Sequence, residues 1–228
     1  MTSKLVDIRS LSDDDIRRYW EAAYARFETP EQETQKFLDR LKWLGADDWD
    51  RQSDIVEIFC GRGNGLNALE SLGFTRLAGV DLSPELVRQY EGSAKMYVAD
   101  CREMPLEDKS RDLVIVQGGL HHLSVLPDDL DRVLSEVCRV LRPDGRFVMV
   151  EPWLTPFLRV VHLGSKLAML KAVSPKVDAL ASMIHYEAPT YFRWLGSKSL
   201  VLRSITDRFE TLYLHRGLGK INFVGRVK

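Results

Sequence analysis

The stretch DIVEIFCGRGNGL, residues 54–66, decides the fold. Its apolar beginning suits a buried strand, and Gly61, Gly63 and Gly65 follow in a loop. Glycines there let the backbone turn sharply and approach a ligand closely, because no Cβ stands in the way. The dinucleotide fingerprint G-x-G-x-x-G would need a glycine at position 66, where this chain has Leu66. The loop therefore predicts a bound cofactor, and Leu66 disfavours a dinucleotide such as that of a nicotinamide dehydrogenase.

Two further strand-like runs repeat the pattern of an apolar segment closed by an acid. Asp81 follows directly after residues 76–80, and Asp100 follows directly after residues 95–99. A carboxylate at the end of the second strand can hold the two hydroxyls of a ribose. Strand, acid, loop and helix therefore recur in register, which one glycine turn found by chance would not predict.

Strands and helices alternate from residue 54 to residue 150. We expect strands at 55–59, 76–80, 96–99, 113–116 and 146–150, and crossover helices at 64–71, 84–90 and 128–141. Two helices should precede them, one capped by Ser12 and one that begins at Thr29 and Pro30. Strand-like runs at 209–214 and 221–227 predict an antiparallel hairpin. These patterns predict an α/β fold with a Rossmann-like, doubly wound, mostly parallel seven-stranded sheet.

The length and composition fit one domain with additions. The 228 residues are 45% hydrophobic and carry a net charge of -1. We expect an N-terminal helical cap at 1–50, a cofactor-binding core at 51–151, a lid insertion at 152–196, and a last helix with the closing hairpin at 197–228. The three cysteines lack metal-like spacing, so we expect reduced thiols and no metal site. The N-terminus has no apolar signal core, and no run reaches about 18 apolar residues. A cytoplasmic location is therefore expected.

Charge is unevenly distributed. Residues 152–228 hold 12 Lys and Arg against four Asp and Glu. Such a basic segment can mark an anionic substrate or an anionic membrane surface, although these charges can equally solvate helix faces. No nucleic-acid-binding module is recognisable, so nucleic acid is not expected as a partner.

Four strings, VEIFCGRGNG, GVDLSPELV, VADCREMPLEDKSRDLVIVQGGLHHL and EVCRVLRPDGRFVMVEP, occur in a characteristic order. Together with the terminal hairpin, they make the chain resemble a class I S-adenosylmethionine-dependent methyltransferase. The resemblance covers about residues 50–152 plus the hairpin. One departure stands out, because Phe59 occupies the place where the family usually has its first glycine.

The resemblance implies S-adenosyl-L-methionine as the cofactor and assigns residues to its parts. Glu57 and the backbone near Gly61 and Gly63 would meet the methionine end, and Asp81 would meet the ribose. The remaining positions would be the adenine amino partner Asp100, the adenine ring neighbours Leu82 and Cys101, and the methionine-side residues Gln117 and Gly118.

Three polar residues at strand ends are candidates for the acceptor side. His121 and His122 follow the fourth strand, and Glu151 ends the fifth. A sulfonium already activates its methyl group, so a base is needed only if the acceptor must lose a proton. Either histidine could be that base, or both could simply shape the pocket. Glu151 could bind an acceptor amine or hydroxyl, or cap the turn at Pro152.

The insertion offers the main information about the acceptor. Residues 153–173 mix large apolar side chains with four basic or histidine residues and contain no acid. Such a segment could cover an apolar substrate, contact an anionic membrane, or form an ordinary amphipathic lid. The later string HYEAPTYFRWLG supplies four substrate-contact candidates, His185, Tyr186, Tyr191 and Arg193. It could also be a packed hinge.

Three functions remain open from the sequence. The first is methyl transfer to a small-molecule acceptor, with O- or N-methylation favoured. The second is methylation of a lipid, glycolipid or other anionic acceptor at a membrane surface. The third is a non-catalytic regulator or scaffold that binds the cofactor. The sequence determines neither the acceptor nor the oligomeric state.

Overall fold

A computed structural model describes residues 12–228, with the side chains at positions 13, 14, 17, 166, 168, 170 and 171 left out. Two helices open this part, α1 (Asp13–Phe27) and α2 (Pro30–Trp43). The Ser12 hydroxyl accepts a hydrogen bond from the backbone N–H of Asp15 at 3.2 Å. Thr29 and Gln32 cap α2 reciprocally. Both predicted N-terminal helices are confirmed.

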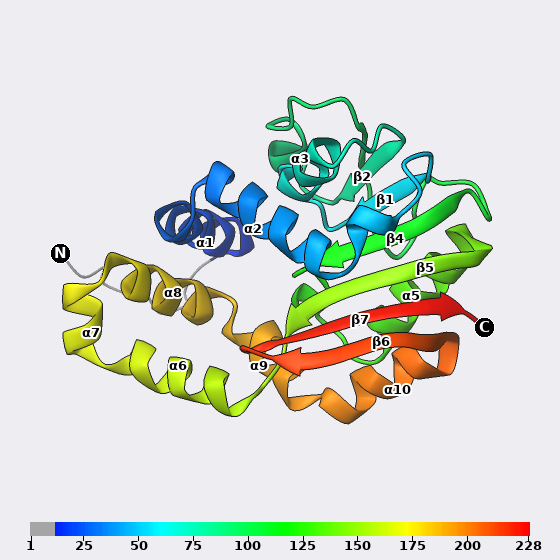
Figure 1. The fold of residues 1–228 in the computed structure, drawn as a ribbon. Helices are drawn as coiled ribbons and strands as arrows, with labels where there is room; N and C mark the ends of the chain where they lie inside the picture. Colours follow the sequence, from blue (N-terminus) through cyan, green and yellow to red (C-terminus); the bar gives the residue numbers. More distant parts are fainter. Residues whose placement is uncertain (1–11) are drawn as a thin grey trace.

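The sheet has seven strands in the order β3-β2-β1-β4-β5-β7-β6 (Figure 1). They are β1 (Ile55–Ile58), β2 (Leu77–Asp81), β3 (Lys95–Val98), β4 (Arg111–Gln117), β5 (Leu141–Pro152), β6 (Phe209–Gly217) and β7 (Lys220–Val227). The first five run parallel, and β7 is antiparallel to both β5 and β6. The predicted fold class is therefore confirmed, including the closing hairpin.

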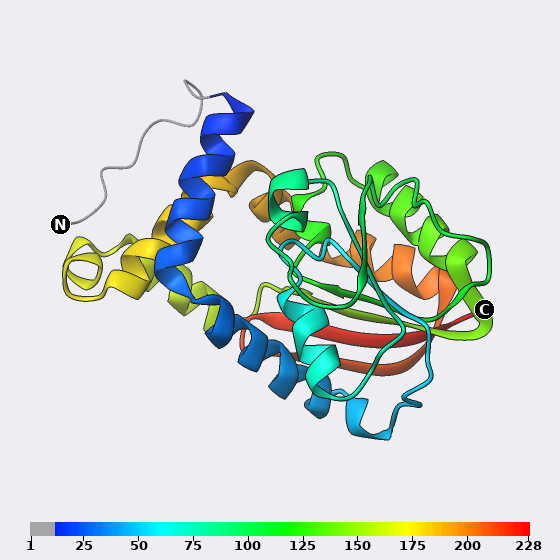
Figure 2. The same cartoon turned by 90° about the horizontal axis from the view of Figure 1, so that it is seen from above.

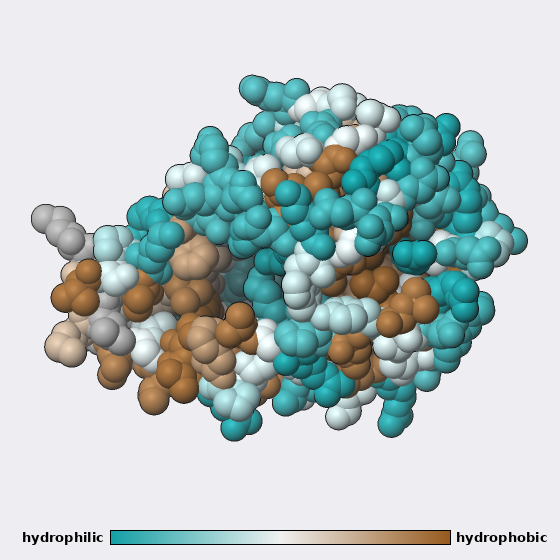
Figure 3. Space-filling model, viewed as in Figure 1, coloured by the Kyte–Doolittle hydropathy of each residue, from teal (hydrophilic) through white to brown (hydrophobic). Residues whose placement is uncertain are grey.

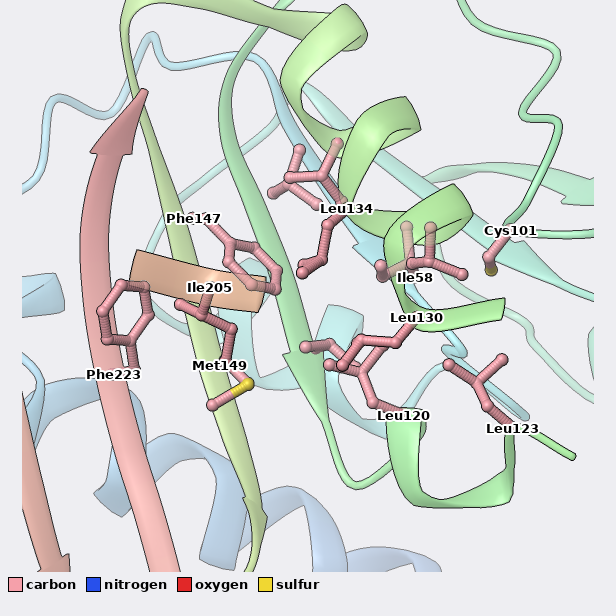
Figure 4. Packing of buried hydrophobic residues seen from close by; sticks show 14 of the residues in the cluster. Ile58, Cys101, Leu120, Leu123, Leu130, Leu134, Phe147, Met149, Ile205 and Phe223 are labelled. Carbon is pink, nitrogen blue, oxygen red and sulfur yellow. The ribbon is translucent and has the colours of Figure 1, made fainter. Parts of the chain in front are cut away.

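Helices cover both faces of this sheet, which explains why its central strands are almost wholly apolar. One face packs against α5 (Asp128–Val140) and α10 (Lys198–Arg208), and Figure 4 shows Phe147, Ile205 and Phe223 meeting in that layer. The other face packs against α2 and α3 (Asn64–Ser71). The strand order reverses between β1 and β4, so ligands are expected beyond the carboxyl ends of these two strands.

Several predicted boundaries differ from the structure, and for two of them the contacts show the reason. The helix expected at 84–90 is only α4 (Pro84–Val87). The chain leaves it because the Tyr90 hydroxyl donates to Glu70 at 2.8 Å and accepts from the backbone N–H of Ala94 at 3.0 Å. Strand β5 begins at Leu141 instead of 146, since Leu141 pairs with Arg111 before the register shifts.

The insertion folds into four helices: α6 (Pro156–Lys166), α7 (Ala168–Val173), α8 (Pro175–Tyr186) and α9 (Ala188–Gly196). Helix α8 packs on α1, through stacked Tyr19 and Tyr186 rings at 5.3 Å and an Arg26–Asp178 ion pair at 3.0 Å. Figure 2 shows α1, α7 and α8 projecting together beside the sheet. Within residues 12–228, no helix is long and apolar enough to cross a bilayer.

Candidate functional site

The loop after β1 keeps a tight path in spite of Phe59. Phe59 has φ 54°, and Gly61 and Gly63 have φ 53° and 79°. This left-handed region suits glycine, because a side chain there is strained. The Phe59 side chain fits because Gly119 lies opposite, where an added Cβ would overlap it. Phe59 thus adopts a backbone conformation that is usual for glycine, and position 119, after β4, has no Cβ that would overlap the Phe59 side chain.

Glu57 places a buried carboxyl group at the centre of the site. It is 3% exposed, and its Oε1 accepts a hydrogen bond from Gln117 at 3.3 Å. Its Oε2 has no hydrogen-bond partner among the described residues. Burial raises the pKa of Glu57 to about 8. Gly65 makes the room, since a Cβ there would lie 2.5 Å from the carboxyl carbon. An unpaired buried oxygen of this kind can receive a cationic ligand group.

Arg40, which the sequence reasoning did not single out, brings a cation to the same place. Its Nη1 donates to Gln117 Oε1 at 3.1 Å, so Gln117 joins Arg40 to Glu57. Burial lowers the pKa of Arg40 to about 10, which leaves the guanidinium charged at neutral pH. A half-buried cation and a buried acid connected by one amide fit the carboxylate and ammonium of a zwitterionic amino-acid group. The residues present therefore fit the methionine end of the expected cofactor.

Helix α2 also fixes the glycine loop. The Asn64 amide donates to Glu33 at 2.6 Å, and the Arg62 guanidinium pairs with Glu33 at 3.3 Å. The Tyr24 ring of α1 lies 5.4 Å from the same guanidinium. Glu33, another residue that the sequence did not indicate, thereby ties the N-terminal cap to the cofactor loop.

The two acids at strand ends lie as the register predicted. The backbone N–H of Gly61 donates to Asp81 at 2.8 Å, and the N–H of Ser83 donates to its other oxygen at 2.8 Å. Asp100 pairs with Arg102, which lowers the pKa of that carboxyl group. Leu82, beside Asp81, is 67% exposed, whereas Cys101 is buried. An exposed leucine and two accessible carboxylates fit a flat polar ligand such as a nucleoside.

A buried pair, His121 and Glu151, occupies the carboxyl ends of β4 and β5. His121 Nδ1 lies 2.8 Å from one oxygen of Glu151. The other oxygen accepts the N–H groups of Gly119 and Leu120, each at 2.8 Å. Glu151 is 1% exposed and its oxygens are engaged in the protein, so it orients His121 and does not face an acceptor. A carboxylate at Nδ1 assigns the proton to that nitrogen and leaves the Nε2 lone pair free.

The surroundings set the charge of this cluster. Burial alone would lower the pKa of His121, but the hydrogen bond and charge of Glu151 outweigh it and raise the pKa. Enclosure by neighbouring groups, followed by the charge of His121, lowers the pKa of His122, although 41% of its side chain is exposed. Burial raises the pKa of Glu187 to about 7. Glu187 lies 3.9 Å from His121 Nε2 and 3.7 Å from His122 Nδ1.

His121, His122 and Glu187 also bring three potential metal-ligand atoms together. One donor atom from each of His121, His122 and Glu187 lies within 4.8 Å of the others. The two imidazole rings lie 4.1 Å apart with 34° between their planes. The three side chains therefore form a compact polar cluster beside the end of β4.

The predicted acceptor residues of the insertion lie in three places. Tyr191 joins the cluster, with its ring 6.1 Å from His121 and its hydroxyl 3.0 Å from His162. Tyr186 stacks on α1, and His185 lies against Tyr186 at 5.0 Å. Arg193 donates to the backbone oxygen of Ser124 and so holds the segment after His122. Glu187, within the same string as Tyr191, faces the histidines instead.

Known proteins resemble this chain in sequence. Residues 56–149 match the family described as "Methyltransferase domain". The chain is 30% identical to the sterol 4-C-methyltransferase strm-1 of Caenorhabditis elegans, over 55% of this chain and 40% of that protein. It is 28% identical to the 27-O-demethylrifamycin SV methyltransferase of Amycolatopsis mediterranei, over 75% of this chain and 62% of that protein. The chain thus spans about half the length of these relatives.

A solved structure of similar fold contains a ligand. The plantazolicin methyltransferase BpumL in complex with SAH, the demethylated form of S-adenosylmethionine, matches with a TM-score of 0.62 and 14% identity, over 95% of this chain and 92% of that one. At this identity the likeness concerns the fold. In this chain the strand order reverses between β1 and β4, and open α/β sheets bind ligands at such a switch point.

Proposed function

Because this chain belongs to the class I S-adenosylmethionine-dependent methyltransferases, with S-adenosylmethionine as the methyl donor of its domain, we propose that it methylates an oxygen or nitrogen of a small-molecule acceptor. The observation that carries the proposal is the buried His121–Glu151 pair, with its 2.8 Å hydrogen bond. A histidine oriented in this way can remove a proton from a hydroxyl or ammonium group, which transfer to these atoms requires.

Residues of the glycine loop and its neighbours would hold the cofactor. Glu57 Oε2 would receive the ammonium group, and Arg40 would receive the carboxylate. Asp81 would accept hydrogen bonds from the ribose hydroxyls, and Asp100 from the adenine amino group. Leu82 would cover one face of the adenine. These groups together would hold the cofactor beside the residues at the ends of β4 and β5 and supply the methyl group there.

The chemistry then divides between cofactor and protein. When bound, the sulfonium supplies an activated methyl group for in-line displacement. His121 Nε2 would take the proton that the acceptor atom loses, and Glu151 would stabilise the resulting imidazolium. His122 and the Tyr191 hydroxyl would line the acceptor pocket. The insertion would exclude water from the pocket, since α9 brings Tyr191 and α6 brings His162 to one hydrogen bond.

Titration with S-adenosylmethionine and its demethylated product tests the cofactor site. Asp81→Ala is expected to weaken both severely, by at least about tenfold, because it removes a ribose partner and frees the Gly61 N–H. Asp207→Ala is the matched control, since Asp207 is an exposed acid of α10. Equal affinities for Asp81→Ala and the control would refute the assignment.

A search for turnover with a labelled methyl donor then tests catalysis. Fractionated cell extract supplies candidate acceptors, and label transferred to a small molecule supports the proposal. Tight cofactor binding without transfer to any fraction would instead favour the regulator or scaffold. His121→Ala, which keeps the cofactor residues, separates enzymatic transfer from background.

A lipid or other membrane-bound acceptor is the second candidate. It is favoured by the apolar outer side of the insertion, where Val160 is 68% and Leu163 is 66% exposed. One relative is named for a sterol, which is an apolar acceptor. Dividing the labelled extract into organic and aqueous phases distinguishes the two candidates, since a lipid product would enter the organic phase.

A further inference from the structure

Helix α6 exposes an apolar stripe on the side away from the protein core. Phe157 is 51% exposed, Val160 68%, Leu163 66% and Leu167, its C-cap, 49%. These residues recur every three or four positions, so they share one face of the helix. The opposite side is also apolar, because half-buried Leu158 packs into the hydrophobic core. A helix that is apolar on two sides is normally covered on both.

The stripe continues onto α7, where Met169 is 73% and Val173 is 72% exposed. We call the six residues the α6–α7 apolar surface: Phe157, Val160, Leu163, Leu167, Met169 and Val173. Figure 3 shows apolar side chains gathered over these two helices. Exposed apolar residues are ordinary when scattered, but a contiguous group marks a contact surface.

Positive charge accompanies this surface. Residues 153–177 contain Arg159, Lys166, Lys171 and Lys176 and no acid. Arg159 and Lys176 are exposed. A second copy of the chain placed face to face would bring two such sets of cations together, which opposes self-association. An anionic surface is complementary in charge to these cations, whereas a neutral or basic partner is not.

We infer that the α6–α7 apolar surface docks on an anionic lipid bilayer. Its apolar side chains would enter the headgroup region, and the cations beside them would meet the lipid phosphates. The helices would lie on the membrane and not span it. Apolar burial and charge together give the two contributions that stable peripheral binding needs.

Helix α6 also connects this surface to the acceptor pocket. His162 lies between Val160 and Leu163 in sequence, yet it faces inward, 3.0 Å from the Tyr191 hydroxyl. The Tyr191 ring in turn lies 6.1 Å from His121. Docking would therefore place the proposed acceptor pocket one helix away from the lipid. The inference thus deepens the second candidate function, and it is tested without cofactor or acceptor so that the two can fail separately.

Vesicle flotation of the full chain tests the apolar contribution. We expect binding to phosphatidylcholine vesicles that contain about one third phosphatidylglycerol, and a loss of about tenfold or more in Val160→Asn/Leu163→Asn. Leu212→Asn is the matched control, because Leu212 is 47% exposed on β6, away from the α6–α7 apolar surface, and should bind as the unchanged protein does.

Salt and charge variants test the electrostatic contribution. Arg159→Gln/Lys176→Gln should weaken binding to the anionic vesicles by about fivefold per cation, and binding should fall as salt is raised from about 0.1 to 0.5 M. Unchanged melting temperature and unchanged affinity for the demethylated cofactor show that each variant is folded.

Four results would overturn the inference. One is no binding of the folded protein to anionic vesicles at about 0.1 M salt. The second is equal binding to pure phosphatidylcholine, and the third is equal binding by Val160→Asn/Leu163→Asn and the control. The fourth is a concentration-dependent dimer without vesicle binding that Val160→Asn/Leu163→Asn abolishes, which would assign the surface to a second copy of the chain.

Discussion

Replacing Glu151 by glutamine is the sharpest test of how the acceptor side is built. The substitution keeps the size of the side chain and one carbonyl oxygen. That oxygen can still accept the backbone N–H groups of Gly119 and Leu120, which now reach Glu151 at 2.8 Å each. The other oxygen becomes an amide NH₂ group and faces His121 Nδ1, which it now contacts at 2.8 Å. The change therefore removes a charge and exchanges the donor and acceptor in the hydrogen bond between residue 151 and His121.

The expected loss of stability follows from these contacts. A hydrogen bond to a charged group contributes about 1.5–3 kcal/mol, against about 1 kcal/mol for a neutral one. In Glu151→Gln the two backbone hydrogen bonds remain but are made to a neutral oxygen, and the bond to His121 also becomes a neutral one. We therefore expect the free energy of unfolding to fall by about 2 kcal/mol. For a chain of this length that corresponds to a melting temperature lower by about 4–8 °C.

The pH dependence supplies an independent readout. The pKa of His121 is raised in the folded protein. A raised pKa means that the charged imidazole stabilises folding fully below its unfolded value of about 6.5 and loses this contribution as pH rises through the folded value. The difference in stability between the unchanged protein and Glu151→Gln should therefore be larger at about pH 5.5 than at about pH 9.

Catalysis should fall more than stability. With an NH₂ group at Nδ1, the imidazole must accept there and carry its proton on Nε2, so it has no lone pair for the acceptor. We expect methyl transfer to decrease by about 10²–10⁴ with little change in cofactor affinity.

Urea unfolding followed by tryptophan fluorescence measures the stability, and labelled methyl transfer measures the activity. Glu103→Gln, at an exposed position, is the control and should match the unchanged protein. If Glu151→Gln stayed within about 0.5 kcal/mol of that control at both pH values and kept full activity, the buried pair would have neither role.

Three further changes test the cofactor side. Gly65→Ala should lower the free energy of unfolding in urea by about 1–3 kcal/mol and abolish binding of the demethylated cofactor, because the added Cβ would meet the Glu57 carboxyl group. Gly196→Ala is the control, since the added Cβ has no neighbouring atom within 4 Å, and it should be neutral or slightly stabilising. Burial raises the pKa of Glu57 to about 8, so binding of the cofactor ammonium at pH 7 should release close to one proton. The affinity should therefore fall about tenfold per unit of pH below 8. Calorimetry in buffers of different ionisation enthalpy measures the proton release, and its absence would contradict the pairing of Glu57 with the ammonium group. Arg40→Met, which keeps the aliphatic stem, should weaken cofactor binding by about tenfold or more, and an unchanged affinity would remove Arg40 from the site.

Much of the fold could be read from the sequence because its signals are local. The strand before the glycine loop, the acids Asp81 and Asp100 and the caps at Ser12 and Thr29 each depend on residues a few positions apart. Boundaries failed where a distant partner intervened. Strand β5 starts early because Leu141 pairs with Arg111, thirty positions away.

The candidate site required the tertiary structure for the opposite reason. Arg40 carries no local signal of binding, because its partner Gln117 lies 77 positions later. The pairing of His121 with Glu151 spans 30 positions and fixes which of two neighbouring histidines is oriented. Sequence placed both histidines and Glu151 at strand ends, but only packing shows that Glu151 is enclosed by three donors.

The sequence by itself determined the cofactor class, since a glycine loop followed by acids in register can be recognised along the chain. It also marked Phe59 as out of place. Only the tertiary structure showed that Phe59 adopts φ 54° opposite Gly119, and that the insertion turns an apolar side outward and a polar side toward His121. Backbone angles and the direction of a helix face depend on what packs around them, and local spacing does not encode those neighbours.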